Sequence, residues 1–107
     1  MNEPGSRAQR FASFREFYPY YLREHSNPTS RRLHVIGTSL ALALLAWSLL
    51  NRQWHLLWAV PVAGYAFAWV GHFFFERNVP ATFRYPLYSL QGDLTMLRDV
   101  LTGRIRW

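Results

Sequence analysis

Residues 33–50 read LHVIGTSLALALLAWSLL, and residues 53–75 read QWHLLWAVPVAGYAFAWVGHFFF. The two runs hold 18 and 23 residues without a formal charge, and only Asn51 and Arg52 separate them. As α-helices rising ~1.5 Å per residue, they would extend about 27 and 34 Å, close to the roughly 30 Å hydrocarbon core of a bilayer. Neither run has the polar stripe of a soluble amphipathic helix. The pattern predicts an all-α fold built on a two-pass transmembrane helical hairpin.

The composition favours a membrane protein over the alternative, a soluble helical bundle with two buried helices. The chain has 107 residues, of which 50% are hydrophobic and 17% are charged. Ordinary soluble domains are about 25% charged, and a chain this short has little sequence left to cover two apolar helices. Cysteine is absent and all 12 basic residues are arginine. Disulfides, thiolate metal sites and lysine Schiff-base chemistry are therefore excluded.

Arginine is partitioned by membrane side. Six arginines precede residue 33, five follow residue 75, and the connecting turn carries Arg52 alone. Because cytoplasmic segments accumulate Arg and Lys, we expect an integral membrane protein with both termini in the cytoplasm. Topology and anionic lipid account for the net charge of +6, so no nucleic-acid partner is expected. The short chain without a eukaryotic targeting signal favours a bacterial inner membrane, with the endoplasmic reticulum as the location in a eukaryote.

Amphipathic segments flank the hairpin on both sides. Residues 11–24 place Phe and Tyr at offsets of three and four, with Pro19 expected to interrupt the helix. We expect interfacial helices before and after the hairpin. Residues 1–10 are expected to be disordered, and residues 11–107 to form one membrane domain with spans at about 33–50 and 53–75. The tail segment has leucines on one face and aspartates on the other: Leu90, Leu94, Leu97 and Leu101 against Asp93 and Asp99.

Three of the four histidines are expected to meet at the cytoplasmic face. His34 and His72 stand at the cytoplasmic ends of the two spans, and a turn at Pro28 can bring His25 to the same level. His55 lies 17 residues before His72, about 25 Å away along a helix, and so falls outside a shared site. Glu76 follows His72 by four residues and shares its helical face. Imidazoles with a carboxylate are the set that non-haem Fe(II) prefers, which gives four candidate ligands: His25, His34, His72 and Glu76.

Other polar residues near this set have two interpretations each. Glu24, Asn27 or tyrosine hydroxyls are candidate acceptors for the second nitrogen of each imidazole. Arg31, Arg32 and Arg77 are candidates to bind the carboxylate or phosphate of a substrate or lipid headgroup. The alternative is that the histidines and Glu76 are ordinary interfacial side chains, and that the arginines only fix topology.

The runs FYPYYLREHSNPTSRRLHVIGTSL and AWVGHFFFERNVPATFRYPLYSLQGDLTML resemble the Mpo-like membrane family. The family pattern is Tyr-x-x-x-His, a short Asn/Pro link, Arg-x-x-His-x-x-Gly, and later Gly-His-x-x-x-Glu-x-x-x-Pro-Ala. The resemblance covers about residues 14 to 104 of this chain. The matching positions are Tyr21, His25, Arg31, His34, Gly37, Gly71, His72, Glu76, Pro80 and Ala81.

The resemblance implies a membrane-embedded, Fe(II)-dependent dioxygenase that shortens 2-hydroxy fatty acids by one carbon in fatty acid α-oxidation. It implies His25, His34 and His72 as catalytic iron ligands, with Glu76 a further ligand or an acceptor behind one of them. Arg31 or Arg32 would neutralise the substrate carboxylate. The expected partners are membrane lipid, the fatty acid substrate and, because two spans enclose a site poorly, a second copy of the chain.

Two non-catalytic functions remain as alternatives from the sequence. The first is a small membrane protein that packs against a partner through Gly37 and Gly64, with incidental histidines. The second is a lipid binder that uses the cytoplasmic arginines to bind headgroups without chemistry.

Overall fold

The computed structural model describes residues 11–107, so the disorder predicted for residues 1–10 lies outside the described part. Residues 11–107 form helices joined by turns, and no strand occurs among them. The predicted all-α class is confirmed. The α-helices are α1 (Phe14–Arg23), α2 (Pro28–Leu50), α3 (Ala59–Val70) and α4 (Pro86–Leu101). A 3-10 turn at Trp54–Trp58 precedes α3, a π-helical turn at Gly71–Glu76 follows it, and a second 3-10 turn lies at Ala81–Phe83.

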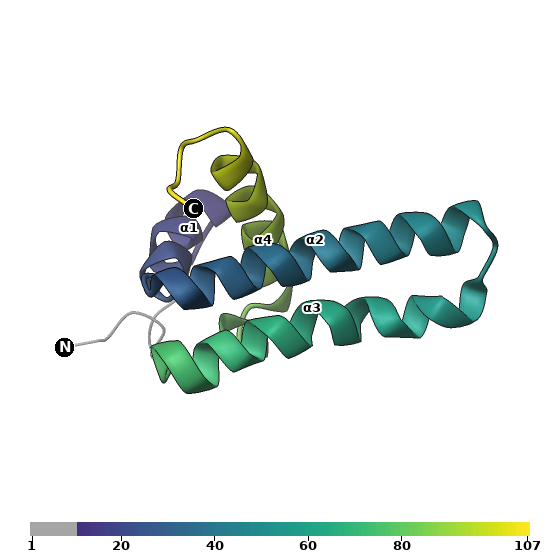
Figure 1. Cartoon of the computed structure of the whole chain (residues 1–107). Coiled ribbons are helices and arrows are strands. Elements are labelled where there is room, and N and C mark those ends of the chain that lie inside the picture. Colours follow the sequence, from purple (N-terminus) through teal and green to yellow (C-terminus); the bar gives the residue numbers. More distant parts are fainter. Residues whose placement is uncertain (1–10) are drawn as a thin grey trace.

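Two long helices run side by side in opposite directions (Figure 1). One is α2, and the other is the continuous helical segment Trp54–Glu76 that contains α3. Each is 23 residues long and apolar enough to cross a membrane. The predicted span at 33–50 lies within the first segment, and the predicted span at 53–75 coincides with the second to within one residue at each end. Large apolar side chains point outward from them, with Leu50 83% and Trp58 82% exposed, which is the surface that a lipid solvent requires.

Gly37 allows α2 and α3 to approach closely. A Cβ atom at Gly37 would lie 2.8 Å from Cβ of Phe67 and 3.0 Å from the carbonyl oxygen of Gly64. At Gly64 the nearest atom to such a Cβ would be Cβ of Ala41 at 3.6 Å, an ordinary contact. Glycine is therefore required at Gly37, the tight point of the helix pair, and is replaceable at Gly64.

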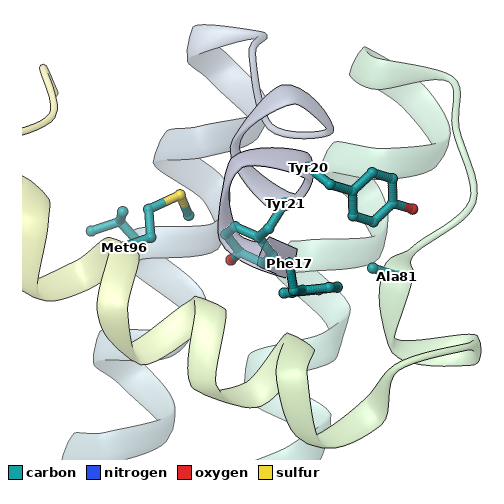
Figure 2. Close-up of a cluster of buried hydrophobic side chains, with 6 residues drawn as sticks. Phe17, Tyr20, Tyr21, Ala81 and Met96 are labelled. Atoms are coloured by element: carbon teal, nitrogen blue, oxygen red, sulfur yellow. The ribbon is translucent and has the colours of Figure 1, made fainter. Parts of the chain in front are cut away.

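An aromatic core lies at one end of the helix pair, between α1, α4 and the 3-10 turn Ala81–Phe83 (Figure 2). Its buried side chains include Phe17 from α1 and Met96 from α4, both fully buried. Ring contacts link α1 to the segment before α4, for example Phe17 to Tyr85 at 5.5 Å between centroids. This core fixes α1 and α4 across the end of the hairpin at which α2 begins (Figure 1).

The predicted interruption at Pro19 is wrong, because α1 runs unbroken from Phe14 to Arg23. Proline removes one helical N–H, but Pro19 lies on the exposed side of α1. The opposite side buries Phe17, Tyr20 and Tyr21. Burial of these three rings outweighs the lost hydrogen bond.

Helix α4 buries its polar side. Its leucines and aspartates lie on opposite faces, as predicted, but the aspartate face is the one that packs against α1. Asp99 accepts a hydrogen bond from the hydroxyl of Tyr18 at 2.8 Å, and Asp93 accepts one from the hydroxyl of Tyr21. The leucine face stays exposed at Leu90, Leu94 and Leu101, with 54%, 42% and 76% of each residue accessible.

Candidate metal centre

The turn between α1 and α2 brings His25 to the start of the hairpin. Asn27 caps α2, because its Oδ1 accepts hydrogen bonds from the N–H groups of Thr29 at 2.9 Å and Ser30 at 3.1 Å. Pro28 follows as the first residue of α2, where its missing N–H costs nothing. The cap reverses the chain direction within a few residues, so that His25 faces α2.

His34 and His72 reach the same point from the two long helices. His34 lies six residues after Pro28 on α2, about 9 Å along the helix. His72 lies in the π-helical turn, whose first residue, Gly71, packs directly on Ser30 of α2. A Cβ atom at Gly71 would lie 2.7 Å from Oγ of Ser30, so glycine permits the approach that places His72 beside His34. π-Helical turns are frequent at functional sites.

The three imidazoles form one buried cluster. His25, His34 and His72 are 1%, 3% and 2% exposed. The Nε2 atoms of His25 and His34 lie 2.9 Å apart, and the ring centroids lie 4.0 to 4.7 Å apart. One nitrogen from each ring falls within 4.8 Å of the others. The predicted convergence of these three histidines is confirmed, and His55 is outside the cluster, as predicted.

Each imidazole has an oxygen acceptor at Nδ1. His25 pairs with the carbonyl of Tyr21 at 2.6 Å, and His34 pairs with the carbonyl of Ser30 at 3.1 Å. His72 pairs with Oδ1 of Asn78 at 2.6 Å. Carbonyl oxygens only accept, so Nδ1 of each ring carries the proton and Nε2 is left as a bare lone pair.

Asn78 is fixed in the orientation that this arrangement needs. Its Nδ2 donates to the carbonyl of Glu24 at 3.2 Å, which leaves Oδ1 to accept from His72. The sequence-based candidates for this role, the Glu24 and Asn27 side chains and tyrosine hydroxyls, are wrong. Two backbone carbonyls and Asn78 serve instead. Asn78 reaches His72 because Arg77 takes a left-handed conformation, with φ of 57°, and ends the π-helical turn.

This donor set fits a metal ion. Two unprotonated Nε2 atoms at 2.9 Å repel each other unless a cation lies between them. Imidazole nitrogens bound to one metal at about 2.1 Å, with an angle near 90°, are roughly 3 Å apart. Burial, together with the neighbouring His34 and His72, lowers the pKa of His25 well below its ordinary value. The ring is therefore held in its neutral, metal-binding form.

A family model described as "2-hydroxy-palmitic acid dioxygenase Mpo1-like" matches residues 11–105. This chain belongs to the Mpo1-like family. The resemblance on which the sequence interpretation depended is thereby confirmed. The match contains all three histidines and Asn78, so the whole cluster is part of the Mpo1-like domain. No curated protein and no solved structure matches the chain.

Glu76 of the Mpo1-like domain does not belong to the close group formed by the three imidazoles. Its Oε1 accepts a hydrogen bond from the backbone N–H of Asn27. The contact ties the end of the second long helix to the start of α2 and stabilises the turn that carries His25. The metal-ligand role of Glu76 stays a prediction.

The three candidate arginines lie around the start of α2 and the end of the second long helix. Nε of Arg31 donates to the carbonyl of Arg106, and Nε of Arg32 donates to the carbonyl of Trp107, both at 3.2 Å. The guanidinium of Arg32 also lies 5.7 Å from the ring centroid of Trp107. Arg77 is exposed at the end of the π-helical turn. A substrate-binding role for these arginines stays a prediction.

Proposed function

We propose that this chain is a membrane-embedded dioxygenase that uses Fe(II) to shorten 2-hydroxy fatty acids by one carbon. The observation that carries the proposal is the buried cluster of His25, His34 and His72, in which one nitrogen of each ring lies within 4.8 Å of the others and each Nδ1 has an oxygen acceptor. The description of the Mpo1-like family supports the substrate class. Three imidazole ligands leave open positions on the metal, as non-haem oxygenases require.

The residues at this site have two roles: the imidazoles bind the metal, and their hydrogen-bond acceptors orient the rings. Fe(II) held by the three Nε2 atoms would supply the oxygen activation that breaks the C1–C2 bond of the substrate. The carbonyls of Tyr21 and Ser30 and the amide of Asn78 hold the tautomer and orientation of the rings. Burial excludes bulk water from the imidazoles.

The position of the cluster along the hairpin suits a fatty acid. His34 lies about 9 Å from the start of α2, near the end of the hairpin that α1 and α4 cover (Figure 1). A fatty acid in a bilayer places its carboxylate near this depth and its chain along the spans. We place both termini on the arginine-rich, cytoplasmic side of an inner membrane.

The proposal is tested with protein purified in detergent, loaded anaerobically with Fe(II), and supplied with 2-hydroxypalmitate and oxygen. We expect an acid one carbon shorter as product, and we expect His72→Ala to abolish both iron retention and product formation. His55→Ala, on the exposed turn outside the cluster, is the matched control and should behave as wild type. Iron content and product formation that survive His72→Ala would refute the proposal. Loose metal binding with a co-purifying protein would favour the non-catalytic alternative.

A further inference from the structure

Three buried side-chain polar atoms have no hydrogen-bond partner within residues 11–107: Oγ of Ser30, Nε1 of Trp69 and Oγ of Ser89. Trp69 and Ser89 line a cavity of about 20 Å³ whose wall also includes the three imidazoles. Buried polar groups in folded proteins are nearly always hydrogen-bonded, so an unpaired pair on one cavity wall indicates a ligand that supplies the partners.

Asp93 adds an acceptor to these two donors. It lines the same cavity, and its Oδ1 already accepts a hydrogen bond from the hydroxyl of Tyr21. The cavity therefore presents an indole N–H, a serine hydroxyl and a carboxylate beside the metal ligands. A small molecule that carries both a carboxylate and a hydroxyl is complementary to this set.

An apolar groove of about 420 Å³ lies beside the cavity, between α2, α3 and α4. Tyr65, Ala68 and Asp93 line both spaces, so the groove and the cavity are neighbours at these residues. The rest of the groove wall is mostly apolar and belongs to the lipid-exposed part of the hairpin and to α4. Its members include Ala41, Leu42, Leu45, Val60, Leu90 and Leu94.

We propose that the cavity and the groove form one binding site for a single-chain 2-hydroxy fatty acid. Trp69 and Ser89 donate hydrogen bonds to the oxygens of its head, Asp93 accepts from its hydroxyl, and its acyl chain occupies the groove. The choice of head group rests on the proposed function. The occupant is an acyl chain because the groove wall is mostly apolar and adjoins the cavity that holds the polar groups and the imidazoles. A cavity of about 20 Å³ has room for about one water-sized group, so it takes an oxygen of the head while the rest of the molecule lies in the groove.

The acyl-chain part is tested on metal-free protein in detergent with a 2-hydroxypalmitate analogue that carries a photoreactive diazirine on its chain. We expect labelling of α2 and α4 at groove residues, and we expect unlabelled 2-hydroxypalmitate to compete it away. Leu42→Trp fills the groove and should reduce this labelling about tenfold. Leu40→Trp is the matched control, since Leu40 is also half-exposed on α2 but lies outside the groove. Labelling spread evenly over the lipid face, or equal in the two variants, would overturn the proposal.

The head-group part is tested by the affinity of metal-free protein for 2-hydroxypalmitate. Trp69→Phe and Ser89→Ala each remove one donor while they keep most of the packing, and each should weaken binding about tenfold. Trp58→Phe, at an exposed site near the turn, should not change the affinity. Unchanged affinity in both cavity variants would overturn the assignment of the donors.

The two proposals fail in different ways. If Trp69→Phe and Ser89→Ala retain wild-type iron content, affinity and product formation, the binding site is wrong and the dioxygenase proposal stands. If metal-free protein binds 2-hydroxypalmitate in the groove but the chain never retains iron, the binding site stands and the dioxygenase proposal fails. If both variants keep wild-type iron content but need more substrate for half-maximal rate, both proposals are supported.

Discussion

The two ends of the helical hairpin differ in which side chains they expose and which they bury. At the turn end, the large side chains of Trp47, Leu50, Trp54 and Trp58 are 58%, 83%, 57% and 82% exposed. At the other end, where α1 and α4 pack (Figure 1), the polar side chains of Ser30 and the three clustered histidines are buried. Exposed apolar side chains suit the lipid solvent of the proposed topology, while hydrogen bonds to carbonyls and Asn78 stabilise the buried imidazoles at the second end. In the proposed function, the turn end anchors the chain in the membrane and the covered end carries the chemistry.

The largest expected effect is the loss of one imidazole at the covered end. His34→Ala removes one of the three Nε2 donors and should lower the affinity for Fe(II) by more than about 100-fold. Loss of a hydrogen-bond partner behind a metal ligand lowers metal affinity by about 10- to 100-fold, and loss of the ligand itself should have a larger effect. His55→Ala, at the turn end, should leave the affinity unchanged. Anaerobic titration of the purified protein with Fe(II) measures both. Equal Fe(II) affinities in the two variants would contradict the claim that only the covered end binds metal.

Asn78 tests the same comparison between the two ends, with a smaller expected effect on metal affinity. Asn78→Ala removes the acceptor that holds Nδ1 of His72 and should weaken metal binding by about 10- to 100-fold. The control is Asn51→Ala, because the Asn51 side chain also hydrogen-bonds a backbone carbonyl, that of Trp47, but at the turn end. The same titration detects the difference. An Asn78→Ala protein with wild-type affinity would show that the orientation of His72 does not depend on this amide.

Gly37 tests how the two long helices are joined. Gly37→Ala forces a Cβ atom against Phe67 and the Gly64 carbonyl, and should reduce the free energy of unfolding by about 1–3 kcal/mol. Gly64→Ala introduces only an ordinary contact with Ala41 and should have little effect. Thermal unfolding in detergent compares the variants. If Gly64→Ala proved the more damaging of the two, the described packing of α2 on α3 would be wrong.

The smallest expected effect concerns the pH dependence of stability. Burial raises the pKa of Asp93 from 3.8 to about 6 in the folded protein, although the hydrogen bond from Tyr21 opposes the shift. The folded state therefore holds this proton more tightly than the unfolded state, so stability is lost as pH rises from about 4 through about 6. Asp93→Asn should remove that loss, so the variant should gain stability relative to wild type as the pH rises from 5 to 7. Unfolding of both proteins at pH 5 and pH 7 measures the difference, and parallel pH profiles would contradict the assignment.

Local patterns explain why the hairpin and the histidine cluster were predictable. Two long uncharged runs predict the length of the two helices and their apolar surface. The spacing of His25, Pro28 and His34 predicts that one turn brings the two imidazole rings together. The position of His72 at the end of the second run follows from the same length argument. All of these depend on helix geometry alone.

The rest of the site depends on tertiary details that carry no sequence period. Asn78 reaches His72 only because a π-helical turn ends at a left-handed Arg77. Asp93 lines the cavity because the polar face of α4 packs inward while Leu90, Leu94 and Leu101 face outward. In a soluble protein the same pattern would predict the reverse orientation, so the sequence pattern alone does not place Asp93 in the cavity.

The central claim is that three imidazoles hold one metal ion at the covered end of the hairpin. X-ray absorption at the iron edge of Fe(II)-loaded protein in detergent tests it most directly. The account predicts one iron per chain, with scattering from three imidazole rings that falls to two in His34→Ala. Iron coordinated only by oxygen, or a spectrum that His34→Ala leaves unchanged, would contradict it.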